Sequence, residues 1–331
     1  MGLEIYIPNT GQGDCTFIKF PNGENMLIDF NKTDVDVDII ELLKELVPEK
    51  KCDKTGERYR EINYFVNTHP HDDHIKGIGA LLEDEFRIQK IWESGHRLEI
   101  KKEEEKDYKN YYDFLKLIKK VEKKGSSNVS ILKASSTPKM IGDVEMYILG
   151  PSKVLQNSKG NDIHEQCGIF KIEYQGNSIL FAGDSDKENW EERIVKHYSN
   201  ILPSTVLHVS HHGSKYFFMG KNAEKIEYIE GLKKINPSYC IISVGKDNRH
   251  GHPHDEAMKE YKTYKTYLTS QHKSIFFAFM KSGDLYFEKN IAKDQLKIKR
   301  DEVFEEHKKG NKASVAKNTI AAVAGIAPWG K

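Results

Sequence analysis

The sequence has no long apolar run and almost no net charge. No apolar stretch approaches the roughly 20 residues that a membrane-spanning helix requires. The first residues also lack the basic and apolar regions of a signal peptide. The formal net charge is +1 over 331 residues, which argues against a strongly basic protein that coats nucleic acid. We therefore expect a globular protein without a transmembrane segment.

Cysteine is also scarce, and the four cysteines show no paired spacing. Cys15, Cys167 and Cys240 lie in or beside apolar stretches that predict strands, so we expect them to be buried free thiols. This usage is typical of a reducing compartment, and we expect a cytoplasmic protein.

Short apolar or alternating stretches recur along the chain and predict strands. Helical spacing of apolar residues predicts helices at residues 35–46, 108–123, 188–198, 223–234 and 255–264. Residues 49–61 are polar and predict a loop. Strands come early in both halves of the chain, and helices are more frequent later in each half. This order predicts an α/β (α+β) fold, a four-layer αββα sandwich with two packed sheets and helices outside.

The pattern weakens after about residue 289, which predicts a domain boundary. We expect a hydrolase-like domain over residues 1–290, followed by a charged helix and a small, apolar C-terminal tail over 291–331. The apolar segment at its end, residues 319–331, is too short to span a bilayer. We favour docking to a protein partner for this tail, with an interfacial anchor or an unstructured end as alternatives.

The most informative motif is His69-Pro70-His71-Asp72-Asp73-His74, which follows an apolar strand and precedes a helix. Residues i and i+2 of an extended segment point the same way, so His69 and His71 can bind one metal ion. Asp73 and His74 lie where the chain turns and suit a second ion. Imidazole and carboxylate groups bind zinc and manganese. Two ions about 3.5–4 Å apart can share a hydroxide that attacks a substrate. The motif predicts a metal-dependent hydrolase.

Further candidate ligands follow three later strands. Asp184 ends an apolar strand after Gly183, and this carboxylate could bridge two ions. His211 and His212 end another strand, and His252 lies in the loop after the next. Together with the first motif, these residues predict two divalent metal ions, zinc or manganese.

The motifs together resemble the metallo-β-lactamase superfamily, and within it the soluble hydrolase domain of the ComEC competence proteins. The matching segments are Gly11-Gln12-Gly13-Asp14, Leu27-Ile28-Asp29, residues 68–74, Gly183-Asp184, residues 209–214 and Gly251-His252-Pro253-His254. This resemblance implies the αββα fold, a metal-dependent phosphodiesterase or nuclease, and a nucleic acid or nucleotide substrate. It also implies that Asp29 braces the metal loop. ComEC proteins carry a multi-helix membrane channel that this sequence lacks, so we expect a stand-alone relative.

The resemblance also extends the ligand set. The predicted metal ligands are His69, His71, Asp73, His74, His164, Asp184 and His211. Asp162 is the alternative to His164, because the register of the segment Asn161-Asp162-Ile163-His164 is ambiguous. His252 is the alternative to His211 as the last ligand. We otherwise assign His252, with Asp73, to catalysis: His252 as general acid or phosphate contact, and Asp73 to orient the nucleophile.

Several residues beside these loops are candidates for substrate binding, namely His212, Ser214, Lys215, Lys246, Arg249 and His254. Two other functions remain open. The same site could hydrolyse a lactone, an amide or a thioester, because hydroxide attacks carbonyl carbon and phosphorus alike. The chain could instead be a metal-stabilised binding module that recruits a partner through its tail.

Overall fold

A computed structural model describes residues 2–33, 35–83, 85–152, 163–220, 222–291 and 300–305 of the chain. Its first sheet is formed by β1 (Leu3–Ile7), β2 (Thr16–Lys19), β3 (Asn25–Ile28), β5 (Glu49–Lys51), β6 (Arg58–Asn67), β7 (Phe86–Glu93), β8 (Val129–Ile131), β16 (Ser274–Phe279) and β17 (Leu285–Ile291). The spatial order is β17-β16-β1-β2-β3-β6-β7-β8, with β5 paired to β6. The short strand β4 (Phe30–Asn31) bridges to Ile75 and Lys76.

The second sheet is formed by β9 (Lys139–Ile141), β10 (Val144–Gly150), β11 (Ile169–Tyr174), β12 (Asn177–Phe181), β13 (Val206–His208), β14 (Tyr239–Ile242) and β15 (Lys265–Leu268). Its order is β15-β14-β13-β12-β11-β10-β9. Parallel strands in the second sheet are β12, β13, β14 and β15. Parallel strands in the first sheet include β3, β6 and β7. The carboxyl ends of parallel strands share one edge of a sheet, where ligands commonly bind.

Apolar residues alternate between two sides of each sheet. On β1, Ile5 and Ile7 pack between the two sheets, whereas Tyr6 faces the helices. On β11, Phe170 enters the layer between the sheets and Ile169 faces the other helical layer. Both faces of each sheet are thus buried, which accounts for the nearly continuous apolar strands.

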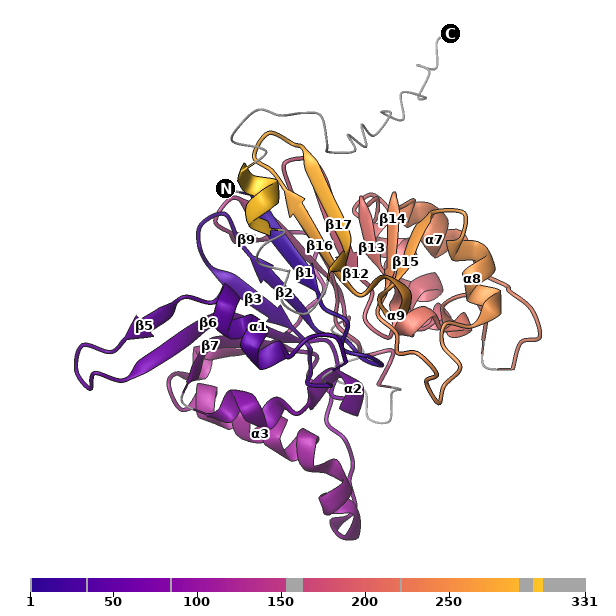
Figure 1. The fold of residues 1–331 in the computed structure, drawn as a ribbon. Coiled ribbons are helices and arrows are strands. Elements are labelled where there is room, and N and C mark those ends of the chain that lie inside the picture. The colour runs from indigo at the N-terminus through magenta and orange to yellow at the C-terminus, as the bar shows by residue number, and fades with distance from the viewer. Residues whose placement is uncertain are drawn as a thin grey trace.

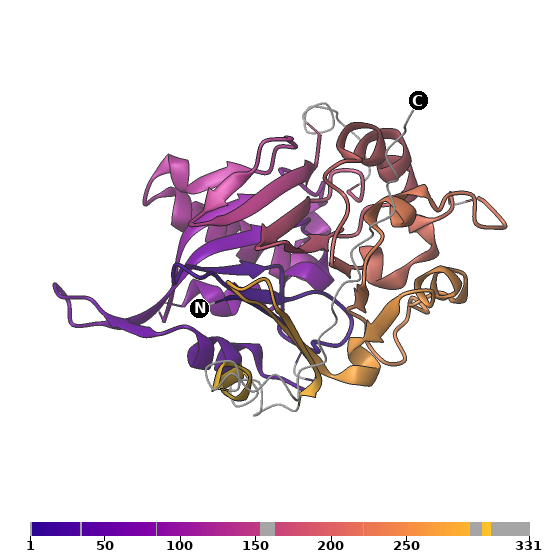
Figure 2. The ribbon, with the colours of Figure 1, turned by 90° about the horizontal axis from the view of Figure 1, so that it is seen from above.

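Helices cover the two outer faces. The helices are α1 (Ile39–Leu46), α2 (Asp72–Ile75), α3 (Lys109–Glu122), α5 (Lys187–Asn189), α6 (Val195–Tyr198), α7 (Glu230–Ile235), α8 (Asp255–Tyr261) and α9 (Thr269–His272). Figures 1 and 2 show α1 and α3 on the side of the first sheet and α7 and α8 on the side of the second. The predicted αββα sandwich is therefore confirmed. None of the helices in these ranges is long and apolar enough to cross a membrane.

Helix α1 shows how the sequence fixes an element. Its buried residues Ile39, Leu42, Leu43 and Leu46 form one apolar stripe, and each contributes about 1.5–3 kcal/mol by burial. The helix starts at Ile39 because the Asp38 carboxylate accepts hydrogen bonds from the backbone of Ile40 and Glu41. The prediction of a helix from residue 35 was therefore a few residues too long.

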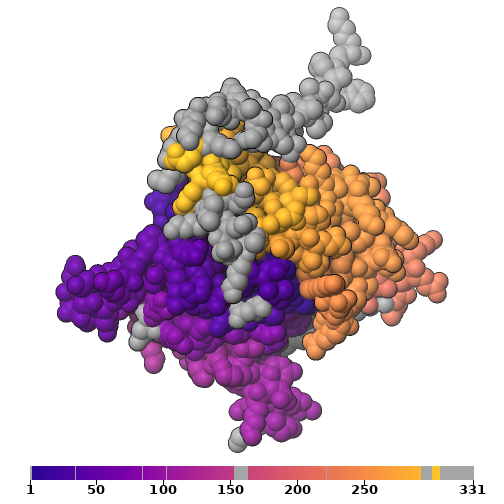
Figure 3. All heavy atoms as spheres, viewed as in Figure 1, coloured from indigo at the N-terminus to yellow at the C-terminus, as the bar shows by residue number. Residues whose placement is uncertain are grey.

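The predicted loop at residues 49–61 was wrong. Strand β5 and the start of β6 form an antiparallel hairpin that projects from the molecule, at the left in Figures 1 and 3. Ion pairs join its two strands, with Arg58 at 2.5 Å from Glu49 and Lys50 at 2.7 Å from Glu61. Because β5 is exposed throughout, it needs no apolar alternation, and its sequence therefore resembles a loop.

The helix predicted at residues 223–234 is shorter, because α7 starts only at Glu230. The preceding residues are held elsewhere: the backbone amides of Glu227 and Tyr228 both donate to the carbonyl of Phe218. This pairing prevents them from joining the helix. The predicted domain boundary at residue 290 remains a prediction, and the C-terminal tail lies outside the described residues.

Candidate metal centre

The histidines and aspartates singled out in the sequence gather where strands of the two sheets end. Residues 68–74 follow β6, Asp184 follows β12, and His211 and His212 follow β13. The loop that carries His252 follows β14. Parallel pairing within each sheet places these ends together, although the segments lie far apart in sequence.

Asp29 braces the metal loop, as the resemblance implied. The fully buried carboxylate accepts hydrogen bonds from the Thr68 backbone at 2.8 Å and the Thr68 hydroxyl at 2.6 Å. It also accepts a bond from the Asn67 side chain and lies 2.8 Å from His74 Nδ1. An N–H at Nδ1 of His74 leaves Nε2 with a free lone pair, the form in which imidazole binds a metal.

A first cluster combines His69, His71, His164 and Asp184. One side-chain donor atom from each residue lies within 4.8 Å of the others. His69 Nε2 lies 3.0 Å from His71 Nδ1 and 3.6 Å from Asp184 Oδ2. Three imidazoles and a carboxylate match the donor types of a zinc site. His164 therefore joins the cluster as predicted, and its alternative, Asp162, lies outside the described residues.

A second cluster combines Asp14, His74, Asp184 and His212, and all four side chains are buried. Their donor atoms again lie within 4.8 Å of one another. Asp73 lies beside them, with its carboxylate 3.2 Å from His212 Nε2 and 4.0 Å from His74 Nε2. Asp184 belongs to both clusters.

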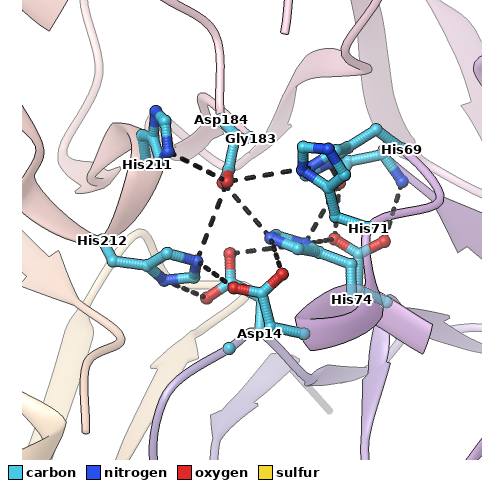
Figure 4. Close-up of polar contacts among 12 residues, drawn as sticks. Asp14, His69, His71, His74, Gly183, Asp184, His211 and His212 are labelled. Carbon is cyan, nitrogen blue, oxygen red and sulfur yellow. Dashed lines mark hydrogen bonds and ion pairs between the residues drawn. The ribbon is translucent and has the colours of Figure 1, made fainter. Parts of the chain in front are cut away.

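Asp184 is the centre of the arrangement, as Figure 4 shows. Its carboxylate oxygens lie 3.2–3.8 Å from nitrogens of four imidazoles, those of His69, His74, His211 and His212. The carboxylate approaches this closely because Gly183 has φ +53° and packs against Cys167. The Asp184 amide also donates to Cys167 Sγ at 3.2 Å.

The second cluster contains buried atoms that no hydrogen bond satisfies. Within the described part of the chain, Asp14 Oδ1, His74 Nε2, Asp184 Oδ1 and His212 Nε2 make no hydrogen bond of good geometry, although His74 Nε2 lies 3.2 Å from Asp184 Oδ1 and His212 Nε2 lies 3.2 Å from Asp73 Oδ2. Leaving a buried polar group unpaired costs about 1–3 kcal/mol. Four such atoms facing one space fit a bound cation, which would satisfy all of them together.

The pKa shifts divide the imidazoles into two kinds. Burial lowers the pKa of His71 to about 4 and, with the nearby His74, holds the pKa of His69 well below its usual range. Both rings are neutral at neutral pH, as metal ligands must be. Burial would also lower the pKa of His212, but the surrounding carboxylates, above all Asp184, raise it to about 10. The second cluster therefore favours positive charge in its centre.

A third group lies at the rim of the first cluster. The Asp186 carboxylate lies 3.2 Å from His211 Nδ1 and 3.4 Å from His164 Nδ1. Burial would raise the pKa of Asp186, but these two imidazoles lower it. Asp186 thus orients both rings through their Nδ1 atoms.

The two adjacent histidines fall into different groups of candidate ligands. We assigned His211 to the metal and His212 to the substrate; His212 belongs to the buried second cluster, and His211 groups with His164 and Asp186. His211 Nε2 still lies 3.7 Å from Asp184. Both residues have positive φ, 51° and 53°, so the turn directs their side chains differently from an extended strand.

His252 lies over the second cluster. Its ring stacks on that of His212 with centroids 6.2 Å apart, and lies 5.4 Å from that of His211. Asn248 fixes this loop, because its side chain accepts from the His252 amide and donates to the His252 carbonyl. Burial, followed by the nearby His211, lowers the pKa of His252 to about 3. The imidazole is thus a neutral hydrogen-bonding group at neutral pH.

The other predicted substrate-binding residues divide into two groups. Ser214 is fully buried and accepts a hydrogen bond from the Tyr216 amide, and His254 accepts one from the Lys215 amide. These contacts shape the loop. Lys215 is partly exposed and lies 3.7 Å from Glu256. Lys246 and Arg249 are exposed on the loop after β14.

Three residues of the centre were not predicted as such. Asp14 and Asp186 carry no ligand spacing of their own, and Cys167 was predicted only as a core thiol. Asp186 follows Gly183-Asp184 by two residues, which could have indicated it. Asp14 ends the Gly-Gln-Gly-Asp segment, whose closeness to the metal loop only the fold reveals.

Known proteins resemble the chain in sequence. The family model described as the metallo-beta-lactamase superfamily matches residues 8–226. The chain is 26% identical over 205 residues to ComE operon protein 3 of Bacillus subtilis, covering 62% of this chain and 23% of that protein. It is 30% identical over 123 residues to recombination protein 2 of Haemophilus influenzae, covering 37% of this chain and 14% of that protein. The matches thus span less than a quarter of the length of these relatives.

Among solved structures, the metallo-beta-lactamase fold protein YhfI of Bacillus subtilis is similar with a TM-score of 0.44 and 12% sequence identity. The match covers 87% of this chain and 100% of that one.

Proposed function

Because the chain belongs to the metallo-β-lactamase superfamily, a superfamily of metal-dependent hydrolases, we propose that it is a dinuclear metallohydrolase that cleaves phosphodiesters of nucleic acids or nucleotides. The observation that carries this proposal is the pair of His and Asp clusters that share Asp184. One closed four-ligand shell is enough for a structural metal, whereas two joined clusters suit catalysis by two ions.

The proposed ligands follow the two clusters. His69, His71 and His164 hold one zinc or manganese ion, and His74, Asp73 and His212 hold the other, with Asp184 shared between them. We prefer His212 to His211 for the second ion because His212 belongs to the second cluster and its Nε2 lies 3.2 Å from the Asp73 carboxylate. When bound, two divalent ions would supply a nucleophile from water and positive charge for the phosphoryl oxygens.

The other proposed roles are to orient the nucleophile and to bind the substrate. Asp73 lies at the edge of the second cluster, where its carboxylate can accept a proton from the attacking water. His252 presents a neutral imidazole that can donate a hydrogen bond to the leaving oxygen. A bound phosphate anion beside it would favour its protonated form. Lys215, Lys246 and Arg249 provide positive charge on the adjacent loops.

Two further observations support a phosphodiester over a carbonyl substrate. The motifs Gly-Gln-Gly-Asp, His-His-Gly-Ser and Gly-His-Pro-His are those of the ComEC-like resemblance, and one curated relative is named for recombination. The three cationic side chains on the loops after β13 and β14 also suit an anionic substrate better than a neutral lactone.

A side-by-side substrate panel tests the proposal. The purified chain, loaded with Zn²⁺ or Mn²⁺, is assayed on single- and double-stranded DNA, RNA, a cyclic dinucleotide, a phosphomonoester, a lactone and a thioester. We expect cleavage of a phosphodiester and a loss of at least 100-fold in Asp184→Asn. The exposed Asp143→Asn is the matched control and keeps wild-type activity. Cleavage of only the lactone or thioester supports the carbonyl alternative, and no turnover with any substrate supports a binding module.

A further inference from the structure

The segment Gly11-Gln12-Gly13-Asp14 is bound directly to the metal loop. The Asp14 amide donates to the Asp73 carbonyl at 3.1 Å, and the Asn31 side chain donates to the same carbonyl at 3.0 Å. A Cβ at Gly13 would lie 1.9 Å from Asn31 Nδ2 and 2.2 Å from the Asp73 carbonyl oxygen. Only glycine permits this approach, which places the Asp14 side chain beside the ligands.

The same segment is held from the other sheet as well. The Gly245 amide, beyond the end of β14, donates to Gln12 Oε1 at 3.2 Å. A Cβ at Gly245 would lie 2.6 Å from the Gln12 amide nitrogen. Residues 11–14 are thus fixed from both halves of the sandwich, and the position of the Asp14 carboxylate is determined by backbone contacts.

The Asp14 carboxylate is not the nearest partner of any neighbouring imidazole nitrogen. It lies 3.8 Å or more from the nearest nitrogens of His74, His208 and His212. Each of those nitrogens has a closer partner: Asp29 at 2.8 Å, the Ser243 hydroxyl at 2.9 Å and the Ser243 carbonyl at 2.8 Å, respectively. The side chain is 10% exposed, and Oδ1 has no hydrogen bond within the described residues. A buried carboxylate oxygen without a hydrogen bond in this position fits a bound cation.

We propose that Asp14 is itself a ligand of the second metal ion. Its carboxylate makes the second position prefer an ion with a stronger preference for oxygen ligands than the ion in the first position. The inference rests on the dinuclear function proposed above. The donor atoms of Asp14, His74, Asp184 and His212 lie within 4.8 Å of one another. Two ligands at about 2.0–2.2 Å from one ion lie at most about 4.4 Å apart, so a small side-chain adjustment completes the shell.

The two positions then differ in donor chemistry. The first has three imidazoles and one shared carboxylate, from His69, His71, His164 and Asp184. The second has two imidazoles and three carboxylates, those of Asp14, Asp73 and Asp184. Imidazole-rich sites suit zinc, whereas carboxylate-rich sites suit manganese and magnesium. The first position therefore retains Zn²⁺, and the second takes Mn²⁺.

The test measures metal binding rather than turnover. The metal-stripped full chain receives one equivalent of Zn²⁺ and is then titrated with Mn²⁺, whose free concentration is followed by electron paramagnetic resonance. We expect wild type to bind one Mn²⁺ and Asp14→Asn to bind it at least tenfold more weakly while retaining its Zn²⁺. Asp72→Asn is the matched control, because Asp72 adjoins Asp73 in the metal-loop motif but is exposed and binds only the Asn110 side chain among the contacts described. Its Mn²⁺ affinity stays within twofold of wild type.

A second measurement needs no variant and so holds even if Asp14→Asn fails to fold. Electron–nuclear double resonance on Mn²⁺ in the Zn²⁺-loaded wild type should detect two imidazole nitrogens, and three would overturn the proposal. An Asp14→Asn affinity within twofold of wild type, or a Zn²⁺-loaded wild type that binds no Mn²⁺, would also overturn it while leaving the dinuclear function intact. A wild-type chain that binds no divalent ion would overturn both.

Discussion

Asp29 and His74 are joined by a 2.8 Å contact between a carboxylate oxygen and Nδ1, although 45 residues separate them. The same carboxylate binds Thr68, which precedes His69, the first proposed ligand of the metal loop. Asp29 therefore fixes both the backbone of the loop and the ring orientation of His74, another proposed ligand. Its φ of 52° is tolerated by Asp and Asn, so substitution by Asn tests the charge without adding backbone strain.

Asp29→Asn is expected to weaken metal binding by about 10–100-fold, because the carboxylate sets the tautomer and basicity of His74. Global stability also falls by about 1–3 kcal/mol, since one buried hydrogen bond is lost. Metal affinity by competition with a chelator and urea unfolding measure the two effects. Asp143→Asn, an exposed aspartate, is the control. Unchanged metal affinity in Asp29→Asn would contradict a role for this residue in orienting His74.

Gly183→Ala should disrupt the centre by displacing Asp184. The new Cβ would lie 2.3 Å from Cys167 Sγ and 2.9 Å from the Gly168 carbonyl oxygen. We expect a loss of about 3 kcal/mol or more in unfolding free energy, together with loss of metal. Gly176→Ala is the matched control for Gly183→Ala, because Gly176 also has positive φ but a Cβ at this position would meet nothing within 4 Å. It should cost only about 1–2 kcal/mol in urea unfolding and leave metal binding intact. Equal losses in both variants would refute the packing argument.

His252→Ala is expected to lower kcat for the phosphodiester by about 10²–10⁴-fold without changing metal content, because the ring lies over the second cluster rather than within it. His250→Ala is the control from the same loop, since His250 is exposed. Steady-state kinetics and metal analysis of both variants distinguish a catalytic role of His252 from a role as metal ligand. Loss of an ion from His252→Ala would instead make His252 a ligand, the alternative that the sequence left open.

Cys52 is expected to be the reactive thiol of the described residues. Hydrogen bonds from Thr55, first from its side chain, lower the pKa of Cys52 to about 7. Burial raises the pKa of Cys15 and of Cys240 to about 12 and that of Cys167 well above its usual range. Because the thiolate is the nucleophile, alkylation by iodoacetamide should fall as pH drops through about 7 and level off above it. Mass spectrometry should locate the label on Cys52, and rapid labelling of a second cysteine would contradict this assignment.

The sequence predicted much of the centre because its signals are local. The ligands of the metal loop lie within six residues, and Asp184 and His211-His212 directly follow apolar strands. Short, nearly continuous apolar stretches likewise predicted strands of the two sheets, since both faces of each sheet are buried. The predicted buried thiols Cys15, Cys167 and Cys240 are confirmed by their burial.

The remaining features depend on distant contacts or unusual backbone conformations. Asp14 is held at the second cluster by hydrogen bonds that Gln12 accepts from Asn31 and Gly245 and by the bond that the Asp14 amide donates to the Asp73 carbonyl. The separation of His211 and His212 into different groups also depends on the backbone, because both adopt positive φ, where the alternation rule of strands fails. The β5–β6 hairpin escaped prediction because ion pairs rather than apolar residues join its strands.

The number of divalent ions held by one chain tests the central claim most directly. Inductively coupled plasma mass spectrometry on the reconstituted, desalted protein should find two ions per wild-type chain. Asp184→Asn should retain one or none, because Asp184 belongs to both clusters. A wild-type chain that holds at most one ion, or an Asp184→Asn variant that keeps two, would contradict a dinuclear centre built around this carboxylate.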